Sequence, residues 1–267
     1  MAISEILTAA LLGVVEGITE FLPISSTGHL IILVDLLEFK GPPGRVFEVV
    51  IQFGAILGVC WVYKDRLLPL VVNPAAPDNR HLWVILGIGF LPAALIGFFA
   101  HGFIKSVLFD PLVVSCSLVA GGIAIIVIER LALRSTISSI DQITPAQAVK
   151  IGLCQALAMI PGTSRSGATI MGGLLFGLDR RTAAELSFIL AIPTMFAASA
   201  YDLYRSSGNL DGDGAALLAV GFASAFASAI LSVRWLVAFV SRHSFTPFGW
   251  YRIVGGILMA WWLLSPQ

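Results

Sequence analysis

The stretch Gly13-Val-Val-Glu-Gly-Ile-Thr-Glu-Phe-Leu-Pro-Ile-Ser-Ser-Thr-Gly-His29 interrupts an apolar run with two acids, a proline and a group of hydroxyl residues. Before the interruption, residues 6–22 have the length and composition of a membrane helix, whereas residues 28–37 after it are too short to cross a bilayer. Non-helical backbone survives at membrane depth only where protein or a watery cavity surrounds it. The stretch therefore predicts a re-entrant helix–loop–helix segment.

The composition of the whole chain is that of an integral membrane protein. Of its 267 residues, 57% are hydrophobic and only 12% are charged, which is about half the charged fraction of a soluble domain. The 16 Lys and Arg residues balance 16 Asp and Glu residues, so the formal net charge is zero. Nucleic-acid binding needs an excess of positive charge, so we expect no nucleic-acid partner. The excess of apolar residues excludes a disordered chain.

Apolar runs recur along the chain and predict an all-α polytopic membrane protein. Helices satisfy their own backbone in lipid, and the strand alternation of a membrane barrel is missing from the sequence. We expect residues 1–267 to form a single integral membrane domain in the lipid bilayer. The apolar runs cover residues 6–22, 28–37, 47–63, 82–104, 112–128, 143–160, 167–178, 183–204, 215–240 and 247–264.

The first break in the apolar pattern reads Leu22-Pro-Ile-Ser-Ser-Thr-Gly-His29. A second break, Ile160-Pro-Gly-Thr-Ser-Arg-Ser-Gly167, repeats its plan, and another short apolar run follows it. A shift of 139 residues places Gly13 on Gly152, Ser25 on Ser164, Gly28 on Gly167 and Ile31 on Ile170. Duplicated broken helices point to a site near the interface between two repeats. We therefore expect an internal inverted repeat, with halves at approximately 1–130 and 140–267 and two re-entrant segments.

Glu16 and Glu20 lie in the first apolar run, where a charged side chain costs about 2.5 to 3.5 kcal/mol. Their spacing of four puts both carboxylates on one helical face. Two ionised carboxylates there repel, so either one holds a proton or a cation lies between them. The alternative is a pair satisfied by hydrogen bonds alone at the mouth of the helix.

The first break contains three residues with hydroxyl side chains, Ser25, Ser26 and Thr27. His29 follows them. Free N–H groups at the start of a helix favour an anion such as phosphate, although Ser and Thr also make ordinary helix caps. With the glutamates upstream, hydroxyl, imidazole and acid converge in the composition of an activated nucleophile.

Ser164, Arg165 and Ser166 form the corresponding group of the second break. The Arg165 guanidinium keeps its charge and matches phosphate oxygens two at a time, while the alternative is a structural pair with a carboxylate. From the residues alone two classes stay open, an enzyme of phosphoryl transfer and a secondary transporter or lipid flippase, because broken helices that meet at the membrane midplane are also the plan of transporters.

The stretch from Gly13 to His29 and the motif Pro161-Gly-Thr-Ser-Arg-Ser-Gly-Ala-Thr169 resemble the signatures of bacterial undecaprenyl-diphosphatases of the bacitracin-resistance type. The stretch Phe47-Glu-Val-Val-Ile-Gln-Phe-Gly54 also fits this family, and the resemblance covers essentially the whole chain.

The resemblance implies a multi-pass enzyme of the bacterial inner membrane, with its active site facing the periplasm or cell exterior. It implies hydrolysis of undecaprenyl diphosphate to the monophosphate, which recycles the lipid carrier for cell-wall synthesis and confers bacitracin resistance. The implied cofactor is Mg²⁺ or Ca²⁺. The oligomeric state, a homodimer included, stays open.

The family's acidic motif falls on Glu16 and Glu20, its Ser and His on Ser26 and His29, and its phosphate-binding Arg on Arg165. We expect Glu16 and Glu20 to hold the metal, and Ser26, with His29 as its acid or base, to attack phosphorus. Water is the alternative nucleophile. The expected phosphate-binding residues are Ser25, Thr27, Ser164, Arg165 and Ser166.

Overall fold

The computed structural model of the chain is built of helices. It describes residues 3–39, 41, 46–103, 110–131, 134–206 and 214–265, and within them it contains helices and one isolated bridge between Ile137 and Leu178 but no strand. The main helices are α1 (Ile3–Thr19), α2 (Ser26–Leu36), α3 (Val46–Val62), α4 (Lys64–Val72), α5 (Pro77–Phe103), α6 (Pro111–Arg130), α7 (Pro145–Ala156), α8 (Arg165–Leu175), α9 (Arg180–Ser206), α10 (Ala215–Val240) and α11 (Thr246–Leu264).

Four of these helices contain a segment long and apolar enough to cross a membrane, in α5, α6, α9 and α10. A fifth span results if α3 and α4, which meet at an angle of 86°, are taken together. Leucine, phenylalanine and tryptophan side chains lie exposed along these helices, as they do on a surface that faces lipid. The prediction of an all-α polytopic membrane protein is confirmed.

The observed helices depart most from the predicted apolar runs in two places. The apolar run 143–160 forms only the 12-residue helix α7, followed by a short 3-10 turn, because Ile160 precedes Pro161 and takes an extended conformation. Between the runs 47–63 and 82–104 the chain forms a further helix, α4, which no apolar run predicted. The short runs at 28–37 and 167–178 match α2 and α8, each of 11 residues.

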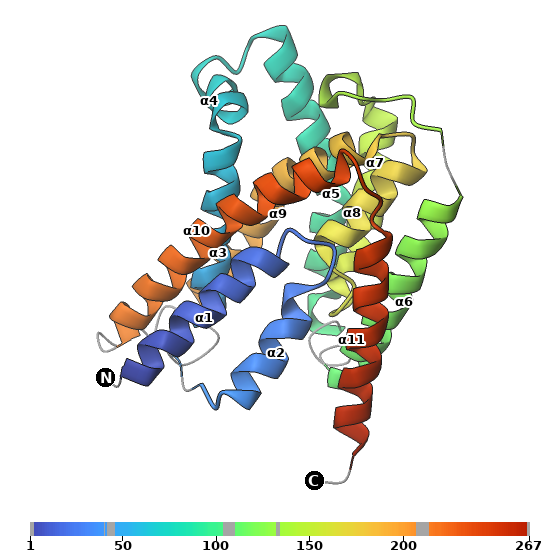
Figure 1. Cartoon of the computed structure of the whole chain (residues 1–267). Helices are drawn as coiled ribbons and strands as arrows, with labels where there is room; N and C mark the ends of the chain where they lie inside the picture. Colours follow the sequence, from blue (N-terminus) through green and yellow to red (C-terminus); the bar gives the residue numbers. More distant parts are fainter. Residues whose placement is uncertain are drawn as a thin grey trace.

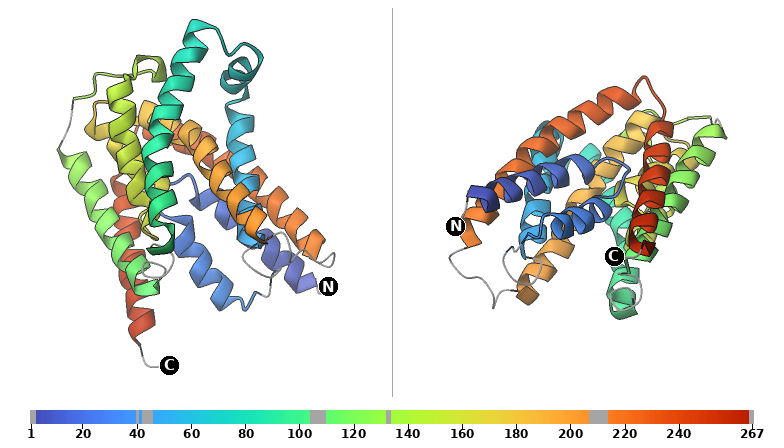
Figure 2. Two further views of the ribbon diagram at one scale, coloured as in Figure 1. Left: turned by 180° about the vertical axis from the view of Figure 1, so that it is seen from behind. Right: turned by 60° about the horizontal axis from the view of Figure 1, so that its bottom comes forward.

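The two predicted halves of the chain are interlocked. Helix α1 packs along α10, α7 packs along α5, and α6 packs along α11 (Figures 1 and 2). Helix α3 joins both α9 and α10. Each short helix pair, α1 with α2 and α7 with α8, turns back at its break, so the breaks lie inside the molecule (Figure 1).

Equivalent glycines make equivalent contacts in the two halves. A Cβ atom on Gly13 would lie 2.3 Å from the carbonyl oxygen of Gly221, and one on Gly152 would lie 2.4 Å from that of Gly89. Glycine thus lets α1 approach α10, and lets α7 approach α5, with backbone against backbone. The inverted repeat and the re-entrant geometry stay predictions, and this matched packing supports them.

The two breaks share one unusual backbone conformation. Ser25 has φ 70° and ψ 98°, and Ser164, which lies 139 residues later, has φ 69° and ψ 115°. Both residues lie in a part of φ/ψ space that side chains other than glycine seldom occupy. Each precedes the first residue of a short helix, so the backbone turns sharply at both points, where α2 and α8 begin.

Candidate active site

Two carboxylates are buried at the end of α1, just before the first break. Helix α1 ends at Thr19, but the backbone N–H of Glu20 still donates to the carbonyl of Glu16, at 2.9 Å, and continues the helical turn. The two acids therefore lie one turn apart, as predicted, with 1% and 8% of their surface exposed. Burial of two acids side by side demands compensating partners.

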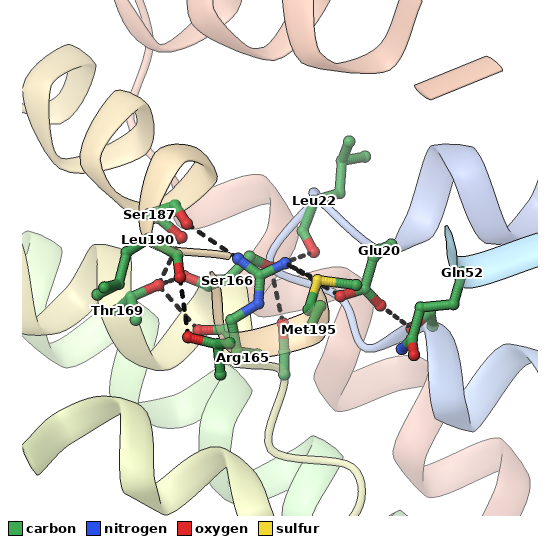
Figure 3. A network of polar contacts seen from close by, with 12 residues as sticks. Glu20, Leu22, Gln52, Arg165, Ser166, Thr169, Ser187, Leu190 and Met195 are labelled. Atoms are coloured by element: carbon green, nitrogen blue, oxygen red, sulfur yellow. Dashed lines mark hydrogen bonds and ion pairs between the residues drawn. The ribbon is translucent and has the colours of Figure 1, made fainter. Parts of the chain in front are cut away.

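Glu20 connects the two breaks. Its Oε2 accepts a hydrogen bond from the Ser26 hydroxyl at 2.5 Å, and its Oε1 pairs with the Arg165 guanidinium at 3.0 Å. Figure 3 shows the Arg165 side chain extending from α8 to Glu20. A pair with a carboxylate was the alternative interpretation of Arg165, and the structure shows such a pair between the two breaks.

Several other groups fix the Arg165 guanidinium (Figure 3). It donates to the carbonyl of Ser187 at 3.0 Å, lies 2.9 Å from the Met195 sulfur, and lies 5.7 Å from the centroid of the Phe21 ring. Ser187 and Met195 lie in α9, and Phe21 lies just before the first break. Both segments therefore position the guanidinium charge. The motif reading did not single out Ser187 or Met195 for this role.

Two polar atoms of the site are buried with no hydrogen-bonding partner among the described residues. They are Oε2 of Glu16, an acceptor, and Nε of Arg165, a donor. Buried polar groups are almost always hydrogen-bonded, so an unpaired acceptor and an unpaired donor at one centre indicate a ligand. A cation satisfies the carboxylate, and a phosphate oxygen satisfies the guanidinium.

His29 is held away from Ser26. Its Nδ1 lies 2.7 Å from the carbonyl oxygen of Ser25, which only accepts, so Nδ1 carries the proton. Its Nε2 therefore accepts from the Tyr251 hydroxyl at 2.6 Å, and the two rings stack with centroids 5.6 Å apart. In the described structure the Ser26 hydroxyl donates to Glu20, and no hydrogen bond joins it to His29.

The hydroxyl residues of the two breaks differ in their availability. Ser25 makes no capping bond at the start of α2, and Thr27 beside it is half-buried. By contrast, Ser164 caps the N–H of Gly167 at 3.1 Å, and the buried Ser166 donates to the carbonyl of Leu22 at 2.8 Å. The first break thus leaves helix N–H groups and hydroxyls open, while the second uses its serines to build the scaffold.

Tyr251 and Arg252 are site residues that the sequence reading missed. Both lie in α11, within the apolar run 247–264. Arg252 is only 1% exposed, and it binds backbone carbonyls of both breaks. The signal was present, because a charged residue inside an apolar run requires a reason just as Glu16 did.

Fold and site together define a multi-pass membrane protein with a buried acid–serine–arginine centre at two broken helices. The chain belongs to the family of bacitracin resistance protein BacA, whose family model matches residues 9–258.

Close relatives carry names of one kind. The chain is 54% identical to "Undecaprenyl-diphosphatase 2" of Paramagnetospirillum magneticum over 95% of this chain and 97% of that protein. It is 51% identical to "Undecaprenyl-diphosphatase" of Aromatoleum aromaticum over 96% of this chain and 94% of that protein. It is 50% identical to "Undecaprenyl-diphosphatase 2" of Rhodospirillum rubrum, over 97% and 95% respectively.

Proposed function

We propose that this chain is an undecaprenyl-diphosphatase, which hydrolyses undecaprenyl diphosphate to undecaprenyl phosphate and inorganic phosphate. The reaction returns the lipid carrier to cell-wall synthesis and confers resistance to bacitracin. One observation carries the proposal at the level of the site. Glu20 binds both the Ser26 hydroxyl and the Arg165 guanidinium. A nucleophile, a base and a positively charged side chain that binds phosphate therefore meet at one buried point.

The diphosphate binds, in this proposal, between the first break and Arg165. The open N-terminus of α2 supplies backbone N–H groups, and the hydroxyls of Ser25 and Thr27 lie beside it. The unpaired Nε of Arg165 supplies a charged donor from the opposite side. Ser164 and Ser166, which the sequence reading also assigned to phosphate, act mainly by holding the second break in place.

The cation Mg²⁺ or Ca²⁺ fits the acidic side of the site. Glu16 has an unpaired buried oxygen one turn from the Glu20 carboxylate, and such hard cations prefer oxygen ligands. The described residues hold no group of three or more His, Cys, Asp or Glu side chains placed for a metal, so Glu16 and Glu20 would hold the cation together with ligands from outside the protein. When bound, the cation neutralises charge on the phosphates.

In the proposed reaction, Ser26 Oγ attacks the terminal phosphorus and its proton passes to Glu20 Oε2, its hydrogen-bonding partner. The bond from that phosphorus to the bridging oxygen breaks, and undecaprenyl phosphate leaves. Water then cleaves the phosphoserine to release inorganic phosphate. Because both nitrogens of His29 are already engaged, His29 serves as a second proton carrier rather than as the first base.

Water as the direct nucleophile is the alternative chemistry at the same site. In that case the Ser26 hydroxyl binds phosphate, and Glu20 activates the water. The variant Ser26→Ala separates the two routes. Loss of about 10³-fold or more in kcat supports the serine nucleophile, whereas activity retained within about tenfold supports water.

The rival class, a transporter or flippase, needs an anion site but no nucleophile with a base. The hydrogen bond from Ser26 to Glu20 is such a pair, and it therefore favours hydrolysis. We also propose that the protein lies in the bacterial inner membrane with its site open to the periplasm or cell exterior.

The test is phosphate release from undecaprenyl diphosphate by purified protein in detergent, with Mg²⁺, Ca²⁺ or a chelator. We expect cation-dependent release that is lost in Arg165→Gln. The matched control is Arg181→Gln, because Arg181 is 64% exposed and pairs with Glu185 at the surface. Absence of release from folded wild-type protein would contradict the proposal, as would full activity in Arg165→Gln.

A further inference from the structure

Arg252 in α11 is the largest fully buried side chain of the described structure, with 1% of its surface exposed. No carboxylate of the described residues forms an ion pair with it. Instead, five backbone carbonyls surround the guanidinium at 2.8 to 3.3 Å, and they belong to Pro23, Ser117, Leu118, Gly162 and Thr163. A guanidinium has five N–H donors, so each of them has its own acceptor.

The five carbonyls come from three separate segments that Arg252 joins. Pro23 belongs to the first break, Gly162 and Thr163 to the second, and the remaining two carbonyls to α6. The shift of 139 residues that relates the breaks places Pro23 on Gly162. Arg252 therefore binds the same carbonyl in both breaks, with one terminal nitrogen on each.

These carbonyls lie close to the residues that shape the site. Pro23 and Gly162 each precede by two residues the serine with positive φ, Ser25 or Ser164, at which α2 or α8 begins. A peptide plane that turns its carbonyl toward Arg252 turns the N–H of the next residue the other way. The guanidinium thus binds both breaks beside the turns at which α2 and α8 start.

Small residues make the room that this guanidinium needs. A Cβ atom on Gly121 in α6 would lie 2.1 Å from one terminal nitrogen of Arg252, and one on Gly167 in α8 would lie 3.2 Å from the other. The packing leaves no donor of Arg252 for a substrate. This differs from Arg165, whose Nε has no partner.

We propose that Arg252 is a positioning residue, which holds the two breaks at the separation that lets Glu20 and Ser26 of one act with Arg165 of the other. The proposal rests on the proposed function for its catalytic readout. Its geometric part, that Arg252 joins the breaks, stands independently of any activity. Displacing reacting groups by about 1 Å costs on the order of 10²-fold in rate, so this role should be visible in kcat.

The first test variant is Arg252→Lys, which keeps the charge but has three donors instead of five. We expect kcat to fall by about 10- to 100-fold with KM within about threefold of wild type. Hydrogen exchange of the peptides covering residues 20–26 and 160–166 should accelerate together, while exchange along α10 stays unchanged. The control is Arg234→Lys, because Arg234 is exposed on α10.

A second variant moves the guanidinium without changing it. Gly121→Ala places a methyl group against Arg252, and we expect the same paired acceleration of exchange in both breaks and the same fall in kcat. The matched control is Gly87→Ala, since a Cβ atom there meets nothing within 4 Å. This variant keeps the proposal testable if Arg252→Lys does not fold.

Three outcomes would overturn the proposal. One is unchanged exchange in either break in both folded variants. Another is wild-type kcat in Arg252→Lys together with loss in Arg252→Met, which would assign the residue an electrostatic role. The third is a fall in thermal stability with exchange raised throughout the protein and kcat retained, which is a purely structural role. If wild-type protein releases no phosphate, the proposed function fails, and the exchange measurements still decide whether Arg252 joins the breaks.

Discussion

The two breaks have the same backbone and opposite chemistry. Ser25 and Ser164 share their unusual φ and ψ angles, and both begin an 11-residue helix inside the molecule. The positions around them differ, since the shift of 139 residues pairs Glu16 with Gln155, Glu20 with Met159 and Ser26 with Arg165. One break thus carries the acids and the hydroxyl, and the other carries the positive charge.

This division explains why neither break could act alone. The acids of the first break need a positive partner to be buried, and Arg165 of the second supplies it through the pair with Glu20. The hydroxyl groups are divided in the same way, because Ser164 caps its own helix whereas Ser25 leaves the start of α2 open. The comparison teaches that two segments with the same backbone conformation provide the frame. The few positions at which their side chains differ create the site.

The largest effect should come from breaking the contact between the breaks at Glu20. Glu20→Gln removes the base from Ser26 and leaves the Arg165 charge unpaired, so we expect phosphate release to fall by about 10³-fold or more. Glu185→Gln is the control, because that carboxylate pairs with the exposed Arg181. A Glu20→Gln protein with more than a tenth of wild-type activity would refute this role.

The shared frame can be tested with the equivalent glycines. Gly13→Ala and Gly152→Ala each force a methyl group against a helix backbone, at 2.3 and 2.4 Å. We expect each to lower the free energy of unfolding in detergent by about 1 to 3 kcal/mol, and by similar amounts. A large loss in one variant with none in the other would argue against equivalent packing of the two halves.

The two serines with positive φ sharpen the comparison further. Alanine suffers the same backbone strain at both positions, so the difference between Ser25→Ala and Ser164→Ala isolates the helix cap. Ser164→Ala should lose about 1 kcal/mol more stability. Ser25→Ala should raise KM by about two- to tenfold, as expected for one lost hydrogen bond to phosphate. Equal KM values in the two variants would remove Ser25 from the phosphate site.

The smallest effect concerns a contact that only the first break has. Tyr251→Phe deletes the hydroxyl that binds His29 Nε2, and the second break has Ala168 where the first has His29. We expect kcat to fall by about two- to tenfold with unchanged stability. Tyr63→Phe serves as the control. An unchanged kcat would mean that the Tyr251 hydroxyl does not support the function of His29.

Much of this arrangement was predictable from the sequence because it follows from local rules. Apolar runs fix the helices, and the proline and hydroxyl groups fix the breaks, so α2 and α8 appear where short runs predicted them. The spacing of Glu16 and Glu20 fixes their common face. A pair between Arg165 and a carboxylate was the alternative to phosphate binding, and only the structure shows that Glu20 is that carboxylate.

The remaining features depend on tertiary packing that the sequence does not express locally. The sequence reading paired Ser26 with His29 by their spacing of three, whereas the structure pairs Ser26 with Glu20 and turns His29 toward Tyr251 of α11. A partner more than 200 residues away leaves no local pattern. The same holds for Arg252, although its charge inside an apolar run was a visible signal.

The central claim, that the two breaks form one site through Glu20 and Arg165, is tested most directly by a double-mutant cycle. The conservative variants Glu20→Asp and Arg165→Lys each shorten or reshape one partner, and kcat/KM for phosphate release is measured for both and for their combination. We predict that kcat/KM of the double variant is scarcely lower than that of the less active single variant. The coupling free energy should be at least about 1.4 kcal/mol. Losses that simply multiply would show that the two residues act independently, and would contradict the account.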